Sequence, residues 1–77
     1  MCDLPERQFE QPPAGASDDL QLCYLAAEGT YADDREACRI GNSPSCQDKL
    51  DCEAAAWAKY EQALSFCRTA YGNGSSN

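Results

Sequence analysis

The sequence predicts a small all-α domain: an antiparallel helical hairpin cross-linked by disulfides, with a short N-terminal helical arm packed against it. Three observations lead to this prediction. The chain has six cysteines in only 77 residues, a density typical of small domains stabilised by disulfides. Two segments show helical periodicity, and the cysteines within them are spaced identically. A chain this short buries too little surface to rely on its core alone, so covalent cross-links are expected.

The chain is interpreted as one domain with three parts: an N-terminal arm and linker (1–16), a disulfide-laddered hairpin (17–72) and a flexible tail (73–77). Asp3 can cap a short helix in the arm, with Pro5 and Glu6 in its first turn. The run 11–16, which contains two prolines and a glycine, predicts a linker after this helix. The expected architecture therefore resembles a three-helix arrangement.

The first long helical segment covers residues 18–40. Ser17 is a suitable N-cap, and apolar residues then recur mostly at steps of three and four as far as Cys38. Gly29 and Thr30 interrupt this pattern, so the segment forms either one helix with a weak middle or two short helices nearly in line. We favour the helix broken at Gly29-Thr30. Gly41 is the natural stop.

The segment from Cys46 to Tyr71 is the strongest helix prediction, because it contains no proline or glycine. Either Ser43 or Ser45 can cap its start, and Gly72 is expected to end it. Its apolar face is predicted to consist of Leu50, Ala54, Trp57, Tyr60, Leu64, Cys67 and Tyr71.

The spacing of the cysteines predicts how the two helices are joined. Cys23 and Cys38 are 15 residues apart, and so are Cys52 and Cys67. Fifteen residues of α-helix rise about 22 Å with about 60° of net rotation, so each pair lies on roughly one face. In an antiparallel hairpin, residues at the same height have position numbers with a constant sum, and this sum is 90 both for Cys23 with Cys67 and for Cys38 with Cys52. The predicted disulfides are Cys23–Cys67, Cys38–Cys52 and, from the remaining cysteines, Cys2–Cys46, which attaches the arm to the hairpin tip.

Disulfides between helices require close packing of the two backbones, because the Cα atoms of a disulfide lie about 4.4–6.8 Å apart. The constant sum places Ala27 opposite Ala63 and Asp34 opposite Ala56. Small side chains at 27, 56 and 63 suit such a seam. Trp57, Tyr60 and Leu64 are expected to flank the seam and to cover the core against the arm.

The composition indicates a secreted soluble protein. Disulfides persist in oxidising compartments, such as the extracellular space or a periplasm. The first residues lack the features of a secretory leader, so a leader is expected to have been removed. The net charge is −7 and the six Lys and Arg residues are scattered, which disfavours nucleic-acid partners. No apolar run is long enough to span a membrane. We expect a monomer with at most weak self-association.

Neither catalysis nor cofactor or metal binding is expected. The chain has no histidine, the commonest general base for Ser and Cys nucleophiles, and no cysteine pair has the C-x₂₋₄-C spacing of structural zinc sites. The carboxylate pairs Asp18/Asp19, Asp33/Asp34 and Asp48/Asp51 lie near predicted helix starts, where negative charge is stabilising.

The predicted tip between the helices carries one specific hypothesis. An exposed Arg39-Ile40 bond beside a cysteine is what an inhibitor of trypsin-like serine proteases presents, and a clamped loop lowers the ordering cost of binding. The simpler interpretation, which we favour, is that Arg39 is a cation at a helix C-terminus and that Ile40 packs on Phe9 or Leu50.

Two further residues have alternative interpretations. Trp57 could be a binding anchor, but its helical position favours the core. Asn73-Gly74-Ser75 matches the N-glycosylation sequon, although a random match explains it equally well.

The function expected from these features is that of a secreted, non-enzymatic interaction protein. Such an extracellular signal, pheromone-like factor, toxin or effector would present a rigid acidic helical surface to a protein receptor. In gross character the chain is similar to the acidic, disulfide-rich helical pheromones of ciliates, although its length and cysteine spacing do not align with theirs. The alternative function is serine protease inhibition through Arg39 and Ile40.

Overall fold

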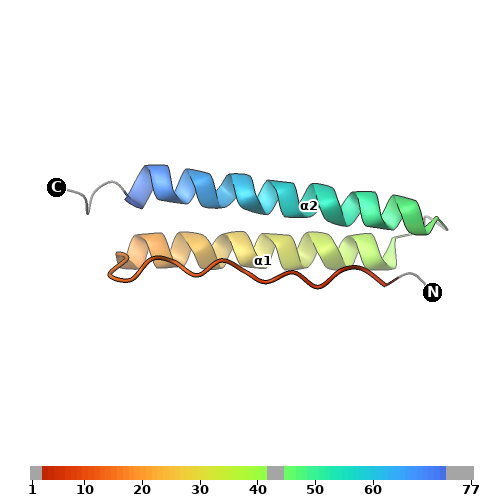
Figure 1. Ribbon diagram of the computed structural model, residues 1–77, viewed down its shortest axis with the longest axis horizontal. Coiled ribbons are helices and arrows are strands. Elements are labelled where there is room, and N and C mark those ends of the chain that lie inside the picture. Colours follow the sequence, from red (N-terminus) through yellow and green to blue (C-terminus); the bar gives the residue numbers. More distant parts are fainter. Residues whose placement is uncertain (1–2, 42–44, 73–77) are drawn as a thin grey trace.

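The computed structural model describes residues 3–41 and 45–72 of the chain. Two long helices, α1 (Asp18–Ile40) and α2 (Cys46–Cys67), are followed by a short π-helical turn, η1 (Arg68–Gly72). Figure 1 shows the two helices side by side and antiparallel, with the N-terminal arm running back along them. The predicted all-α helical hairpin is confirmed, and no strand occurs in the two described stretches.

Serine caps begin both helices. The Ser17 Oγ accepts a hydrogen bond from the backbone N–H of Leu20 at 3.2 Å, as the sequence predicts for α1. At the start of α2, the Ser45 Oγ accepts from the backbone N–H of Asp48 at 3.3 Å. Because each cap satisfies an N–H group that the helix itself cannot pair, it fixes the residue at which the helix begins. Of the two predicted starts for α2, the one at Ser45 is confirmed.

The prediction that the first helix breaks at Gly29-Thr30 is wrong, since α1 is continuous from Asp18 to Ile40. A glycine inside a helix costs only about 1 kcal/mol relative to alanine. The neighbouring core residues Ala27 and Tyr31 are both buried against α2, and this burial offsets the cost. Tertiary packing on both sides of the glycine therefore decides the local structure.

Replacing Gly29 by alanine is expected to stabilise the protein by about 0.5–1 kcal/mol. A Cβ atom at this position would meet nothing within 4 Å, so the gain comes from helix propensity and a less flexible unfolded chain. Chemical denaturation followed by circular dichroism would measure the change. A loss of stability would contradict the continuous α1.

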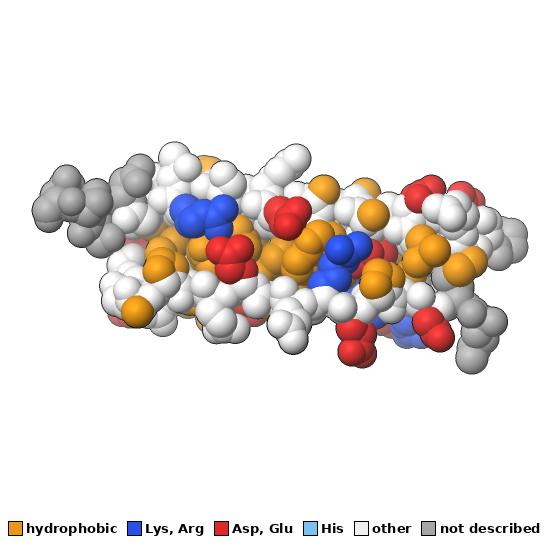
Figure 2. All heavy atoms as spheres, viewed as in Figure 1, with side chains coloured by type: hydrophobic (Ala, Val, Ile, Leu, Met, Phe, Trp, Pro, Cys, Tyr) orange, Lys and Arg blue, Asp and Glu red, His pale blue; other side chains and the backbone are white. Residues whose placement is uncertain are grey.

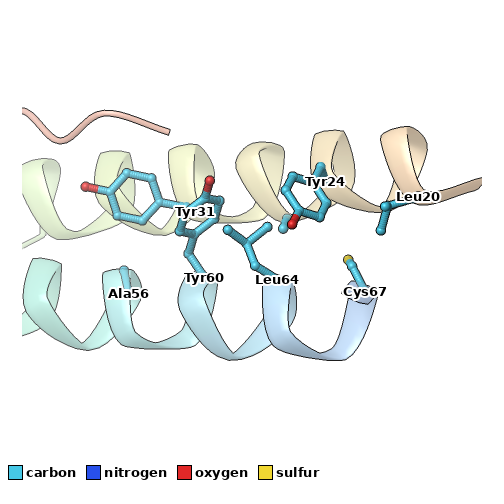
Figure 3. Close-up of a cluster of buried hydrophobic side chains, with 8 residues drawn as sticks. Leu20, Tyr24, Tyr31, Ala56, Tyr60, Leu64 and Cys67 are labelled. Atoms are coloured by element: carbon cyan, nitrogen blue, oxygen red, sulfur yellow. The ribbon is translucent and has the colours of Figure 1, made fainter. Parts of the chain in front are cut away.

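The core lies between the helices and is built from one stripe of each. Figure 3 shows the side chains of Leu20, Tyr24 and Tyr31 on α1 directed toward those of Tyr60, Leu64 and Cys67 on α2. The predicted apolar face of α2 is correct at Tyr60, Leu64 and Cys67 but wrong at Ala54 and Tyr71, which are exposed. Glu53 and Ala56 are buried on α2 instead.

Disulfides cross-link the hairpin at both ends. Cys23 is joined to Cys67 with a Cα–Cα distance of 5.8 Å, and Cys38 is joined to Cys52 with a distance of 5.7 Å. Both pairs match the register that the constant sum predicts. The third predicted bridge, Cys2–Cys46, involves Cys2, which lies outside the described residues.

The arm is not helical as predicted, because residues 3–13 form no secondary structure. A helix of one or two turns is marginal in isolation. The extended arm instead bonds to hairpin side chains: the Glu10 backbone N–H donates to the Tyr60 hydroxyl at 2.9 Å, and Arg35 donates to the carbonyl oxygen of Leu4 at 3.3 Å. The hairpin thus satisfies backbone groups that a short helix would have paired internally.

The linker is a tight turn that reverses the chain into α1. The backbone N–H of Ala16 donates to the carbonyl of Pro13 at 3.0 Å, and Gly15, the third residue of the turn, has φ +81°. This is the geometry of a type II turn, which favours glycine at that position. Because of this turn, the arm runs antiparallel to α1 along the hairpin and reaches the middle of α2.

Candidate interaction surface

The arm covers one side of the hairpin and is anchored by a buried ion pair. The Glu53 side chain on α2 is only 1% exposed. Arg7 on the arm donates two hydrogen bonds to it, with Nε–Oε2 at 2.7 Å and Nη2–Oε1 at 3.0 Å. The hydroxyl of Tyr31 on α1 donates to the same carboxylate. Glu53 therefore ties together the arm and both helices.

These contacts set the ionisation of the buried groups. The hydrogen bonds from Arg7 lower the pKa of Glu53 below its ordinary value, and the bond from Tyr31 lowers it further, although burial acts in the opposite direction. Burial and the hydrogen bond to Glu53 raise the pKa of Tyr31 to about 12. Glu53 is thus a carboxylate with its charge compensated, and this arrangement is typical of a structural role.

An aromatic cluster lies under the arm, where Trp57 is partly buried against the core. The Trp57 ring is 4.7 Å from that of Tyr60 and 5.2 Å from that of Tyr31. Phe9 stacks on it at 6.5 Å, and the Arg7 guanidinium lies 5.3 Å from the ring centroid. Trp57 therefore packs in this cluster, as the favoured interpretation predicts, and its own chain covers it.

An ion pair at the end of the hairpin also joins the arm to this side. Arg68 Nη1, at the start of η1, lies 3.0 Å from the carboxylate of Glu10. Figure 2 shows basic and acidic side chains lying next to one another over the apolar seam. Arg68 and Glu10 thus add a second ion pair between the arm and the hairpin.

The other side of the hairpin carries an open apolar groove between α1 and α2, with a volume of about 290 Å³. Its lining includes Cys23 and Ala26 of α1 and Ala63, Phe66 and Cys67 of α2. No residue of the described arm, 3–16, lines it. At one end, Lys59 Nζ lies 3.4 Å from Asp34 Oδ2. The small residues predicted for the seam therefore form the floor of a groove that the arm leaves open.

Large apolar side chains are exposed beside this groove and on the outer face of α1. Phe66 at the groove is 64% exposed, and Leu22 and Leu25 on α1 are 61% and 59% exposed. Scattered exposed apolar residues are normal, whereas several close together mark interaction sites. The sequence contains one sign of this exposure, since Leu22 and Leu25 fall off the helical stripe that contains Leu20, Tyr24 and Ala27.

The two residues of the inhibitor hypothesis lie at the C-terminus of α1. Arg39 is in the last turn, as predicted for a helix-end cation, and pairs with Glu36. The backbone carbonyl of Arg39 accepts a hydrogen bond from Lys49 Nζ at 2.9 Å. Ile40 is 63% exposed, so the prediction that it packs on Phe9 or Leu50 is wrong. The predicted sequon at Asn73 lies outside the described residues.

The buried carboxylate is the main feature that sequence reasoning missed. Glu53 lies three residues before Ala56 and seven before Tyr60, which places it on the core stripe of α2. In the sequence alone, a glutamate near a helix start is explained by helix propensity and the helix dipole. Its partner Arg7 is 46 residues away in the sequence, and no local pattern connects the two.

Over residues 3–41 and 45–72, no group of three or more potential metal-ligating side chains comes together. The search of the same residues for a helix long and apolar enough to cross a membrane also finds none.

The chain was compared with protein-family models, with curated proteins and with solved structures, and none of them matches it.

Proposed function

We propose that the chain is a secreted, non-enzymatic interaction protein that binds a protein receptor. The observation that carries this proposal is the exposure of Leu22, Leu25 and Phe66 on a hairpin that disulfides clamp at both ends. Exposed apolar side chains on a rigid frame bind with little loss of conformational freedom, because the frame is already ordered. Roles as an extracellular signal, toxin or effector all use this type of binding.

The disulfides also support an extracellular site of action. Both described bridges are of the kind that persists in oxidising compartments. The net charge of −7 favours a receptor surface that carries Lys and Arg, through complementary electrostatics. Acidic charge also limits self-association.

Saturable binding to intact cells of the source organism tests the proposal. We expect fluorescently labelled protein to bind with a half-saturation concentration below about 1 μM, and unlabelled protein to compete. Protease treatment of the cells should abolish binding if the receptor is a protein. A reduced and alkylated sample is the control, because it has the same sequence without the rigid frame. Binding that is not saturable, or that resists protease treatment, would contradict the proposal.

Serine protease inhibition is the second candidate, and the exposure of Ile40 is the observation that favours it. The Arg39-Ile40 bond, however, lies within the last turn of α1, where the backbone is helical and not extended. Trypsin inhibition that is lost in the Arg39→Ala variant would support this candidate over the receptor proposal.

A further inference from the structure

Apolar side chains line the open groove and its edges. Ala26 and Ala63 line the groove between the helices, together with Phe66. Leu22 precedes Ala26 by one turn of α1, so it lies beside the groove at the outer edge of α1. We call Leu22, Ala26, Ala63 and Phe66 the open-side patch.

The charges around the open-side patch are predominantly negative. The stretch 18–34 of α1 contains no Lys or Arg. Its carboxylates on the outer and groove-facing sides are Asp18, Asp19, Asp33 and Asp34, whereas Glu28 lies toward the arm. Two of them, Asp18 and Asp19, lie three to four residues before Leu22 and therefore next to it on the helix. Lys59 is the cation that lies at the groove, and it is paired with Asp34. The remaining carboxylates of α1 therefore favour a partner that brings positive charge.

The arm shows which kinds of side chain bind along the seam between the two helices. On the covered side, the arm places Phe9 against Tyr60 at 5.4 Å between ring centroids and sets Arg7 on the carboxylate of Glu53. Apolar side chains fill the seam there, and a cation compensates an acidic residue. The open side offers the same combination of an apolar seam and carboxylates without a segment of the described chain over it.

We infer that the open-side patch binds a basic amphipathic helix of the partner protein. Such a helix would place apolar residues at i, i+3, i+4 and i+7 in the groove and its Lys and Arg toward the carboxylates of α1. A third helix packed between α1 and α2 completes a three-helix bundle, buries Phe66 and contacts Leu22 at the edge of the groove. This inference rests on the proposed function and names the surface and the partner chemistry. A second copy of the chain is a less favourable occupant, because each copy carries a charge of −7 and like charges repel.

Titration of the isotope-labelled full chain with synthetic peptides tests the inference. The probe is a helix of about 18 residues, or five turns, with leucine on one face and lysine on the other. Its counterpart with glutamate in place of lysine is the charge control. We expect the lysine peptide to shift the NMR signals of Leu22, Ala26 and Phe66, to bind more weakly as salt is added, and to bind better than the glutamate peptide.

Three glutamate substitutions at exposed positions distinguish peptide binding at the patch from general attraction between opposite charges. Leu22→Glu and Phe66→Glu lie in the patch, whereas Ile40→Glu is the control, since Ile40 is equally exposed but lies at the end of α1. All three add the same charge. We expect the patch variants to weaken peptide binding by at least about tenfold, as for hot-spot residues, and the control to change it less than about twofold. Unchanged thermal unfolding would show that all three remain folded.

Equal affinities for patch and control variants, or shifts centred on Arg7 and Phe9, would overturn the inference. So would a concentration-dependent dimer in sedimentation equilibrium that Phe66→Glu dissociates, because the patch would then belong to a second copy.

The same variants in the cell-binding assay distinguish the two proposals. Cell binding that survives both patch substitutions refutes the patch but leaves the receptor proposal standing. A wild-type chain that binds no cell-surface protein refutes the receptor proposal, and this inference with it.

Discussion

Removal of the Cys23–Cys67 disulfide is expected to have the largest effect on stability. A chain with alanine at both positions should lose about 4 kcal/mol of unfolding free energy, because the bridge closes a loop with a sequence separation of 44. The loss should be large relative to the total stability of a domain of this size. Chemical denaturation followed by circular dichroism measures the difference.

The second bridge provides a matched comparison. Alanine at Cys38 and Cys52 opens a loop with a sequence separation of only 14, for which the chain-entropy model predicts about 3 kcal/mol. We therefore expect the Cys23–Cys67 variant to be the less stable of the two. Retention of wild-type stability in either double variant would show that the helices are held mainly by their core.

Replacement of Arg7 by alanine is the second substitution with a large expected effect. It leaves the buried Glu53 carboxylate with the Tyr31 hydroxyl as its remaining side-chain donor. A buried charge that loses its partner costs about 2 kcal/mol or more, and the arm loses its anchor. We expect a lower denaturation midpoint and faster amide hydrogen exchange in α2 beneath the arm.

Arg39→Ala is the control for this substitution. Arg39 also pairs with a glutamate, but both side chains of the Arg39–Glu36 pair are exposed, and exposed pairs add little stability. The denaturation midpoint of this variant should match that of the wild type. If Arg7→Ala behaved in the same way, the anchoring role of the Arg7–Glu53 pair would be refuted.

The same ion pair predicts how stability depends on pH. The folded protein holds the pKa of Glu53 below its ordinary value of 4.5, so the unfolded chain binds a proton there more readily. The contribution of Glu53 is therefore complete above the unfolded pKa and is lost as the pH falls through the folded pKa. Glu53→Gln should flatten this acidic part of the profile; an unchanged slope would contradict the assignment.

The pH dependence of stability that comes from Tyr31 has the opposite sign. Its pKa is raised from 10.0 to about 12 in the folded protein, so the folded state keeps this proton longer than the unfolded chain does. Stability should therefore fall as the pH rises from about 10 to about 12. Tyr31→Phe removes this titration, and denaturation midpoints across the alkaline range would show the difference.

The helical hairpin and its register could be predicted because they depend on local geometry. Serine caps, helical periodicity and the absence of breakers in α2 act within a few residues. The matched spacing of Cys23, Cys38, Cys52 and Cys67 then follows from the rise and rotation of an α-helix. These features specify two antiparallel helices and the disulfides that join them.

By itself, therefore, the sequence determined the helix positions, the cap residues and the pairing of the two described disulfides. Only the tertiary structure decided that α1 continues through Gly29, that the arm is extended, and that Glu53 is buried while Phe66 is exposed. The reason is physical: each of these outcomes depends on contacts between segments far apart in the chain, such as the pair Arg7 and Glu53 at a separation of 46 residues. Such contacts outweigh a local preference of about 1 kcal/mol, and local sequence patterns do not record them.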